Sequence, residues 1–366
     1  MFSPFFFYFA LIMWPIGFFI LWRLKYPRMH ENITIVPGEV SIIIPARNEE
    51  LRLPVLLRSL KEQTIQAGEV IVVDDQSSDD TVNTALSFGV RVVKVDEKPS
   101  GWVGKSWACW QGARAAGKRI LVFLDADVVL GKDGLKKLLS TFMVEKKPVA
   151  VQPYHVMKKP YEYLSAFFNI IVVSGLGAFT MAGSKLRVNG MFGPCIVCFR
   201  DDYFKAGGHE AVKNVVVEDI ALGSAFRRAG FDFSLFGGKG SVNFRMYPEG
   251  FRSLVEGWSK GMASAAGTSS LLLLLSILWL SGGTVAFVLI LRLAVTLPGA
   301  LVSFLYLIIY LMYAVQVGWM LRRIGGFGLL TPLFFPVPLM FFHILFSRSF
   351  FLTFFKKEIT WKGRQV

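Results

Sequence analysis

The chain has 366 residues, of which 53% are hydrophobic, 14% are aromatic and only 18% are charged. This composition excludes a disordered chain and a single soluble domain, and it predicts a globular part of roughly 250 residues joined to membrane-embedded helices. The net charge of +14 is typical of loops that face an anionic cytoplasmic leaflet, so we expect membrane lipids as partners and no nucleic acid.

The first predicted element is a membrane anchor. Residues 4–22 form an uncharged apolar run of 19 residues, and Arg23, Lys25 and Arg28 follow it. This run is long enough to cross a bilayer, and its basic flank is predicted to stay in the cytoplasm. A cleaved signal peptide is the alternative, but no basic segment precedes the run and no small-residue cleavage site follows it.

The middle of the chain, residues 38–248, alternates β-branched runs with helical stretches. Strands are predicted at residues 40–44, 70–73, 90–95, 120–124 and 149–152, and helices at 49–63, 80–88, 105–116 and 132–144. This alternation predicts an α/β fold with a mostly parallel central sheet and flanking helices. Ligands of such sheets bind beyond the carboxyl ends of the strands, where the polar clusters of this chain occur.

Two further spans are predicted at residues 269–291 and 300–321, because both are long and apolar. The turn between them has no Lys or Arg, whereas Arg322 and Arg323 follow the second. This pattern predicts a hairpin that leaves the cytoplasm and returns.

The last apolar region, residues 329–355, contains three prolines and Arg348. A single crossing would place Arg348 and the basic C-terminal tail outside, against the positive-inside rule. We favour a re-entrant or interface-lying pair of short helices, with a third span as the alternative.

Asp125 and Asp127 follow the apolar run ILVFL. Two carboxylates one residue apart at a strand end can face one hard cation, and Mg²⁺ or Mn²⁺ held by few protein oxygens keeps positions open for substrate phosphates. A polar turn is the alternative for a DxD motif on its own. Two other acidic clusters at neighbouring strand ends favour the metal site.

A second acidic cluster, DDQSSDD at residues 74–80, follows the apolar run VIVV. Part of it is expected to cap the helix that starts near Asp80. The cluster holds more carboxylates than a cap requires, so Asp74 and Asp75 are also candidates for recognising a nucleoside.

The ordered set of motifs resembles the nucleotide-sugar-binding half of family 2 glycosyltransferases. The motifs are SIIIPARNEE at residues 41–50, VVDDQSSDDT at 72–81, GKS at 104–106, DAD at 125–127, FR at 199–200, GGH at 207–209 and EDIALG at 218–223. The resemblance covers the whole soluble part. It implies a GT-A fold and an inverting transfer of a sugar from a nucleotide diphosphate.

A closer similarity concerns less general stretches. GWVGKSWACWQG at residues 101–112, VQPYH at 151–155, FGP at 192–194, FRMYPEGF at 244–251 and WKGRQ at 361–365 resemble bacterial carotenoid glycosyltransferases that act on 4,4'-diaponeurosporenoate. The WKGR ending is also similar to that of ceramide glucosyltransferases. These similarities imply a UDP-sugar donor, with glucose from UDP-glucose as the expected sugar, and a lipid-like or carotenoid acceptor.

The family's site residues carry over to matching positions of this chain. The resemblance implies a nucleotide-sugar site of Pro45, Arg47, Glu49, Asp74, Asp75, Lys105, Asp125 and Asp127. Glu49 would lie near the ribose, Asp75 would contact the nucleoside and Lys105 would place a positive charge near the diphosphate. Asp125 and Asp127 would hold Mg²⁺ or Mn²⁺. A solvated lysine at a helix start is the alternative for Lys105.

Asp219 matches the general base of the family's ED pair, and Glu218 is the alternative base. A hydroxyl acceptor would need this base. A carboxylic acid acceptor is already ionised at pH 7 and would need it less. Both acidic motifs must lie on one side of the membrane to share a site. The uncharged residues 164–182 between them are therefore expected to form a buried or interfacial helix rather than a span.

The chain departs from the family where many membrane-associated members have QxxRW. The nearest tryptophan is Trp258, without the expected Gln or Arg. Candidates for the acceptor or diphosphate region are His155, His209, Trp258, Lys260, Trp361 and Arg364. An interfacial anchor is the alternative for Trp258, and a structural histidine is the alternative for His155 and His209. The CxxC at residues 195–198 lacks further zinc ligands and predicts a buried strand.

These predictions define four domains: a transmembrane anchor at residues 1–22, a cytoplasmic GT-A domain at 23–268, a C-terminal membrane region at 269–355 and a basic cytoplasmic tail at 356–366. We expect a multi-pass protein of the cell membrane with a cytoplasmic catalytic domain. Ceramide, hopanoid or diacylglycerol are alternative acceptors. A catalytically silent membrane scaffold is the alternative from another class, and the intact DAD, Lys105 and ED pair argue against it.

Overall fold

The computed structural model describes residues 4–31, 33–95, 98–186, 188, 190–215, 218–261, 270–296, 298–351, 360–361 and 364–365. The chain divides into two compact units, each assembled from separate segments. The helical unit comprises Met1–Leu24, Val156–Val188 and Met246–Val366, and the sheet unit comprises Lys25–His155 and Asn189–Arg245.

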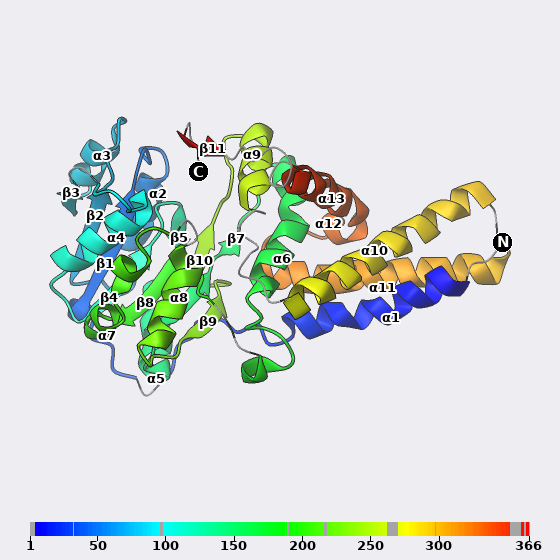
Figure 1. Ribbon diagram of the computed structural model, residues 1–366, viewed down its shortest axis with the longest axis horizontal. Coiled ribbons are helices and arrows are strands. Elements are labelled where there is room, and N and C mark those ends of the chain that lie inside the picture. The colour runs from blue at the N-terminus through cyan, green and yellow to red at the C-terminus, as the bar shows by residue number, and fades with distance from the viewer. Residues whose placement is uncertain are drawn as a thin grey trace. The chain divides into compact units, whose positions relative to one another are not determined.

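The sheet unit is built on a seven-stranded sheet of order β3-β2-β1-β4-β8-β6-β9 (Figure 1). Its strands are β1 Val40–Ala46, β2 Glu69–Asp74, β3 Arg91–Lys94, β4 Ile120–Leu124, β6 Val149–Gln152, β8 Cys195–Phe199 and β9 Ser234–Gly237. All five residues of β4 are buried, as expected for a central strand covered on both faces. The predicted α/β fold with a mostly parallel sheet is confirmed.

Strand β8 runs antiparallel to both of its neighbours, β4 and β6. It contains the CxxC motif, and both Cys195 and Cys198 are buried. The prediction of a buried strand there is therefore confirmed. Burial raises the pKa of both thiols, so the cysteines stay protonated at neutral pH.

Helices flank this sheet, and a small second sheet adjoins it. The helices are α2 Leu53–Lys61, α3 Thr81–Ser87, α4 Gly104–Ala115, α5 Gly134–Glu145, α7 Arg200–Lys205 and α8 Glu218–Arg228, with 3-10 turns η1 Pro37–Glu39 and η4 Gly208–Val212. The small sheet has the order β5-β10-β7, with β5 Val128–Leu130, β10 Val242–Phe244 and β7 Tyr154–His155. Helix α4 packs closely on β1 and β2, because a methyl group at Gly112 would overlap Ile43 and Val73.

The helical unit contains three helices that are long and apolar enough to cross a membrane. They are α1 Pro4–Leu21, α10 Ser270–Thr296 and α11 Ala300–Ile324, and they run side by side in Figure 1. The hydroxyl of Tyr313 donates to the carbonyl of Ala10 at 2.9 Å, and Arg323 donates to the carbonyl of Leu21 at 2.7 Å. Helices α1 and α11 are therefore parallel, which agrees with the predicted hairpin of α10 and α11.

Gln316 joins the three long helices through a buried polar network. Its Nε2 donates to the carbonyl of Trp14 at 2.7 Å, and its Oε1 accepts from Nε1 of Trp279 at 2.7 Å. Gln316 itself is fully buried. A satisfied polar side chain of this kind fixes the register of helices that are otherwise uniformly apolar.

The remaining helices of this unit are short. They are α6 Ala166–Gly175, α9 Phe251–Gly261, α12 Leu330–Leu333 and α13 Pro336–Phe351, with 3-10 turns η2 Pro160–Ser165 and η3 Gly183–Lys185 and a small strand pair β11 Thr360–Trp361 and β12 Arg364–Gln365. Helix α6 has ten residues and is too short to cross a bilayer, so the prediction that residues 164–182 do not form a span is confirmed. Two helices, α12 and α13, follow residue 329, and whether they re-enter the membrane or lie at its interface stays a prediction.

Candidate active site

Three polar clusters meet at one edge of the large sheet. Strand β1 lies between β2 and β4 and is parallel to both. Arg47, Asp75 and Asp125, the residues that directly follow these strands, therefore come to the same edge. Pro45 lies within β1, and the backbone N–H of Glu49 donates to Thr81 Oγ1 at 2.8 Å. The sheet thus gathers the residues predicted to bind a nucleotide sugar.

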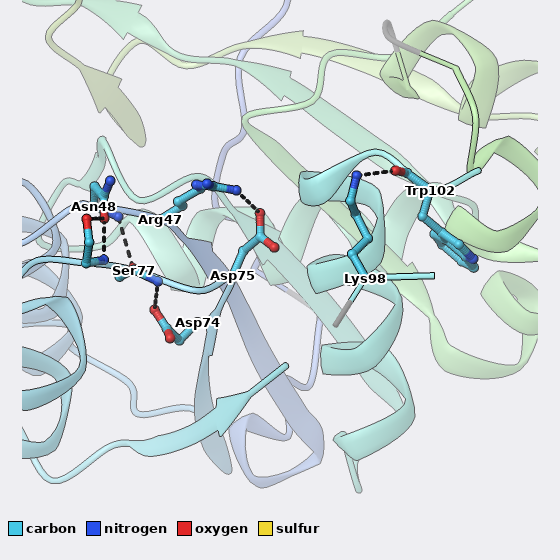
Figure 2. Close-up of polar contacts among 8 residues, drawn as sticks. Arg47, Asn48, Asp74, Asp75, Ser77, Lys98 and Trp102 are labelled. Carbon is cyan, nitrogen blue, oxygen red and sulfur yellow. Dashed lines mark hydrogen bonds and ion pairs between the residues drawn. The ribbon is translucent and has the colours of Figure 1, made fainter. Parts of the chain in front are cut away.

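Asp75 is buried beside two cations (Figure 2). Its Oδ2 lies 3.5 Å from a guanidinium nitrogen of Arg47. Burial raises its pKa, and the charges of Arg47 and Lys98 oppose that rise. The backbone of Gly104 approaches so closely that any β-carbon there would overlap Asp75. Lys98 also donates to the carbonyl of Trp102 at 2.7 Å, which ties the segment before α4 to this corner.

Asp74 has a different role from its neighbour, because it holds the turn that follows β2. Its Oδ1 accepts from the backbone N–H of Ser77 at 3.2 Å. The backbone N–H of Asn48 donates to Ser77 Oγ at 3.0 Å. Both Asn48 and Gln76 have left-handed backbone angles, with φ of 55° and 58°. Asp74 therefore shapes the loop, and Asp75 is the carboxylate that pairs with Arg47.

Lys105 connects the acidic motifs of β4 and α8. Its Nζ lies 2.9 Å from Asp125 Oδ1, 3.2 Å from Glu218 Oε1 and 4.0 Å from Asp219 Oδ1. Burial opposes its charge, but the three carboxylates outweigh burial and raise its pKa well above the usual range. Lys105 is thus not a freely solvated lysine at a helix start. It is the central cation of an acidic cluster built from three distant parts of the sequence.

Asp125 and Asp127 are two carboxylates whose ionised forms burial disfavours, although Lys105 and Arg52 lie near them. Burial raises the pKa of both, and the charge of Asp125 helps to raise the pKa of Asp127 to about 6. Lys105 already neutralises part of Asp125. In the described residues, no group of three Asp, Glu, His or Cys side chains gathers to hold a metal alone. A divalent cation that takes its other ligands from water and phosphate fits this pair.

The ED pair lies at the start of α8, where Glu218 is nearly buried. Burial, followed by the charge of Glu218, raises the pKa of Asp219 to about 8, although Lys105 opposes this. The backbone of Gly193 lies directly against the Asp219 carboxylate, and a β-carbon at that position would overlap it. Asp219 is therefore largely protonated at neutral pH and held in a fixed position.

Gly193→Ala is expected to push Asp219 out of this position. The added methyl group has no room beside the carboxylate, so turnover on a hydroxyl acceptor, which needs Asp219 as its base, should fall by at least tenfold while binding of the donor changes little. Steady-state rates measured against donor concentration would separate the two effects. The control is Gly38→Ala, because an added methyl group at Gly38 meets no other atom and the backbone there is not left-handed. Gly101→Ala is less suitable, because Gly101 has a φ of 83°. Unchanged turnover in Gly193→Ala, as in Gly38→Ala, would contradict this positioning.

The two candidate histidines are both buried in the sheet unit. Nδ1 of His209 lies 2.8 Å from the hydroxyl of Tyr203, which also accepts from the backbone N–H of His209 at 3.0 Å. Burial, with the nearby charge of Lys105, lowers the pKa of His209 to about 3, so its ring is neutral. His155 packs against Phe244 with ring centroids 4.9 Å apart. These environments favour structural roles for both.

Trp258 lies in the helical unit and is buried there. Its Nε1 donates to Ser165 Oγ at 2.9 Å, and its ring stacks on Phe168 at 4.7 Å. This packing differs from that of an exposed interfacial anchor. The side chains of Lys260, Trp361 and Arg364 lie outside the described part of the structure, so their predicted roles stay predictions.

Four residues near the site were not among the predicted site residues. Lys98 and Arg52 contribute positive charge to Asp75 and Asp127, respectively. Gly104 and Gly193 allow the close approach of Asp75 and Asp219. Both glycines stand in motifs that resemble known families, GWVGKS and FGP. Nothing in the sequence around Lys98 or Arg52 distinguishes them from other surface cations.

Comparisons with known proteins agree with this geometry. Residues 41–208 match the model of "Glycosyl transferase family 2". The 4,4'-diaponeurosporenoate glycosyltransferase of Staphylococcus aureus strain USA300 is 38% identical over 332 residues, which are 89% of this chain and 88% of that protein. The enzyme with the same name from strain MRSA252 is also 38% identical over 332 residues.

A solved structure with the same fold is the mannosyltransferase from Pyrobaculum calidifontis in complex with GDP-Man and Mn²⁺. It superimposes with a TM-score of 0.54 at 15% identity and covers 96% of this chain and 100% of that chain. This likeness shows the fold, and the predicted GT-A fold is confirmed. Sequence identity and fold together lead to one conclusion: the chain belongs to glycosyl transferase family 2 and is a membrane-associated glycosyltransferase.

Proposed function

We propose that this enzyme transfers glucose from UDP-glucose, with inversion, to the carboxylate of 4,4'-diaponeurosporenoate. The observation that carries the proposal is the Lys105 cluster, which brings Asp125 within one ion-pair network of Glu218 and Asp219. A donor-side motif and a candidate base therefore share one site. The proposed acceptor follows the relative that is 38% identical over nearly the whole chain, and the proposed donor follows the family resemblance.

The donor would bind along the carboxyl edge of β1, β2 and β4. Asp75 is the proposed contact for the nucleoside, because its carboxylate can accept from a base or ribose. Arg47 pairs with it, and the charge of Lys98 also favours its ionised form. Asp125 and Asp127 are the proposed ligands of Mg²⁺ or Mn²⁺. When bound, the cation would neutralise the charge that develops on the leaving diphosphate.

The acceptor's charge decides what the ED pair has to do. A carotenoid carboxylate is ionised at pH 7, so one of its oxygens can attack the anomeric carbon directly while the bond to the diphosphate breaks. Asp219, with its pKa near 8, carries a proton at that pH and is a poor base. This state suits a carboxylate acceptor, because an ionised Asp219 would repel it. A hydroxyl acceptor would instead require Asp219 to lose its proton first.

Asp219→Asn is therefore expected to distinguish the acceptor classes. With 4,4'-diaponeurosporenoate, turnover at pH 7 should stay within a few-fold of the wild type. With ceramide or diacylglycerol, it should fall by roughly 10²-fold or more. Wild-type turnover on a hydroxyl acceptor should also rise about tenfold per pH unit up to pH 8, because only the ionised form acts as a base. Comparable losses on both acceptor classes would refute this account.

The membrane arrangement is also a proposal. The C-terminal end of α11 and the C-terminal end of α1 lie together, and Arg323 bridges them by donating to the carbonyls of Leu21 and Leu24 at 2.7 and 3.0 Å. By the positive-inside rule this end faces the cytoplasm. A multi-pass protein of the cell membrane with its sheet unit in the cytoplasm follows, and UDP-glucose would reach the site from there.

Helices α12 and α13 are proposed to re-enter the membrane. The ring of Phe335 lies 5.1 Å from that of Tyr310, in the middle of α11. Further along, His343 Nε2 lies 3.0 Å from Thr284 Oγ1, in the middle of α10. Phe334 and Val337 are exposed, which would be unfavourable in water and is natural in hydrocarbon.

This arrangement predicts a deep position for the start of α13. Phe334→Cys or Val337→Cys, labelled with a fluorophore in vesicles, should be quenched by deeply brominated lipids as strongly as Val315→Cys in α11. The three native cysteines are buried and should not compete for the label. Quenching only by lipids brominated near the headgroup would mean that the helices lie at the interface. Opposite-side labelling of Leu329→Cys and Arg348→Cys would mean that the segment crosses.

A turnover assay tests the proposed function. Membranes that contain the chain would receive UDP-glucose, Mn²⁺ or Mg²⁺ and 4,4'-diaponeurosporenoate, with products read by mass spectrometry. A glucosyl ester that disappears on addition of EDTA is the expected result. Slow hydrolysis of UDP-glucose without formation of an ester would support UDP-glucose as the donor and refute 4,4'-diaponeurosporenoate as the acceptor. No reaction with several nucleotide sugars would refute the proposed donor as well.

A further inference from the structure

A cationic depression lies on the sheet unit, away from the site described above. It has a volume of about 630 Å³ and is lined by Arg114, Arg200, Asp201, Phe204 and Lys205. Arg200 follows β8 at Phe199, and Phe199 pairs with Ile120 at the amino end of β4. Asp125 follows the opposite end of β4, so this depression and the candidate active site lie at opposite edges of the sheet.

The positive charge of the depression is not neutralised within the protein. Throughout the described ranges, none of its three cations forms an ion pair, and Arg200 Nε is buried with no hydrogen-bond partner. Asp201 is the one acidic residue in the lining. Formal charges of three cations and one carboxylate leave a net charge of +2 in this set. An anion that enters the depression would be attracted by this unpaired positive charge.

The aromatic floor holds the guanidinium in place. The Arg200 guanidinium carbon lies 4.9 Å from the centroid of the Phe204 ring, and Phe204 packs edge-on against Trp110 at 5.4 Å. This cation–π contact fixes the position of the guanidinium beside the depression. Arg114 and Lys205 are exposed beside it. The planar guanidinium of Arg200 and the exposed cations of Arg114 and Lys205 together form a set of hydrogen-bond donors that suits a tetrahedral oxyanion.

We propose that this depression binds a single phosphate group. A phosphate oxygen would accept from the fork of Arg200, and Arg114 and Lys205 would contact the remaining oxygens. The net charge of +2 matches one phosphate mono- or diester, and Asp201 disfavours polyphosphates by repulsion. The phosphate belongs either to a free metabolite or to the headgroup of an anionic lipid. This inference does not depend on the identity of the sugar or of the acceptor.

The test uses the full chain in lipid nanodiscs. One arm measures the thermal midpoint in phosphatidylcholine discs with sodium phosphate, against sodium chloride at equal ionic strength. The other arm measures the phosphatidylglycerol retained on the protein from mixed discs by native mass spectrometry. The variant Arg114→Gln/Lys205→Gln removes two exposed cations, so it should fold. The matched control Lys132→Gln/Arg228→Gln removes the same charge from exposed positions elsewhere on the unit.

The double variant is expected to weaken binding about tenfold, while the control behaves as the wild type. Arg200→Lys should also weaken it, because lysine lacks the planar fork. A phosphate-dependent midpoint lost in the variant supports a free phosphate ligand. Loss of phosphatidylglycerol alone supports a lipid headgroup. Equal behaviour of wild type, variant and control in both arms would overturn the proposal.

Discussion

Replacing Asp127 with Asn is expected to lower turnover by roughly 10²- to 10³-fold, which is the usual cost of removing one preorganised electrostatic group from a reacting centre. The loss should come without a loss of stability. Burial and the charge of Asp125 raise the pKa of Asp127 to about 6, so the folded protein gains little from its ionised form. An uncharged amide of the same shape relieves the repulsion between the two carboxylates.

Turnover at saturating UDP-glucose and the thermal midpoint, measured on the same preparation, check this prediction. Asp232→Asn is the control, because Asp232 is an exposed carboxylate outside the site. We expect the midpoint of Asp127→Asn to equal or exceed that of the wild type. Turnover of Asp127→Asn near the wild-type rate would show that Asp127 has no role in the reaction. A lowered midpoint would show instead that its charge is needed for folding.

Lys105→Met is expected to have the second large effect, and it acts on both stability and turnover. Without the ammonium group, the charges of Asp125 and Glu218 have no cation between them, beside the protonated Asp219. Removing one partner of an ion-pair network leaves the other partners unpaired. Because the Lys105 side chain is about one-third exposed, we expect the free energy of unfolding to fall by on the order of 2 kcal/mol. Turnover should fall by roughly 10²-fold or more, because both halves of the site lose their positions.

A second substitution separates repulsion from a simple packing defect. Adding Glu218→Gln to Lys105→Met removes one of the repelling carboxylates, so the double variant should regain part of the lost midpoint. Lys132→Met, at an exposed lysine, serves as the control. If Glu218→Gln lowers the midpoint further in the Lys105→Met background, the loss arises from packing, and the proposed electrostatic role of Lys105 is wrong.

The sequence predicts the parallel part of the sheet well. The strands β1, β2 and β4 are contiguous apolar runs that end in polar residues, and local pattern alone locates them. The direction of β8 could not be predicted, because an antiparallel strand buried on both faces has the same apolar pattern as a parallel one. The strands β5, β7 and β10 have only two or three residues, too few for any period to show.

The site is less predictable than the fold. Motifs identify Asp75, Asp125, Asp127 and Asp219 as chemically important, but they do not reveal which groups meet. The contact of Lys105 with Glu218 joins residues more than 100 positions apart, and only the sheet order brings them together. The burial of Trp258 against Phe168 is equally nonlocal, because it depends on packing between helices that are remote in sequence.

The helical unit is assembled from three separate segments of the chain, and this has a consequence for biogenesis. The chain passes between units after residues 24, 155, 188 and 245, and the Tyr313 hydroxyl binds the carbonyl of Ala10 across 303 positions of sequence. In the proposed membrane arrangement, α1 would enter the bilayer long before its partners α10 and α11 have been translated. The sheet unit could complete its own contacts first, and closure of the helix bundle would then be the last step of maturation. A ribosome that stalls before residue 270 would leave an anchored sheet unit whose first helix lacks both long neighbours.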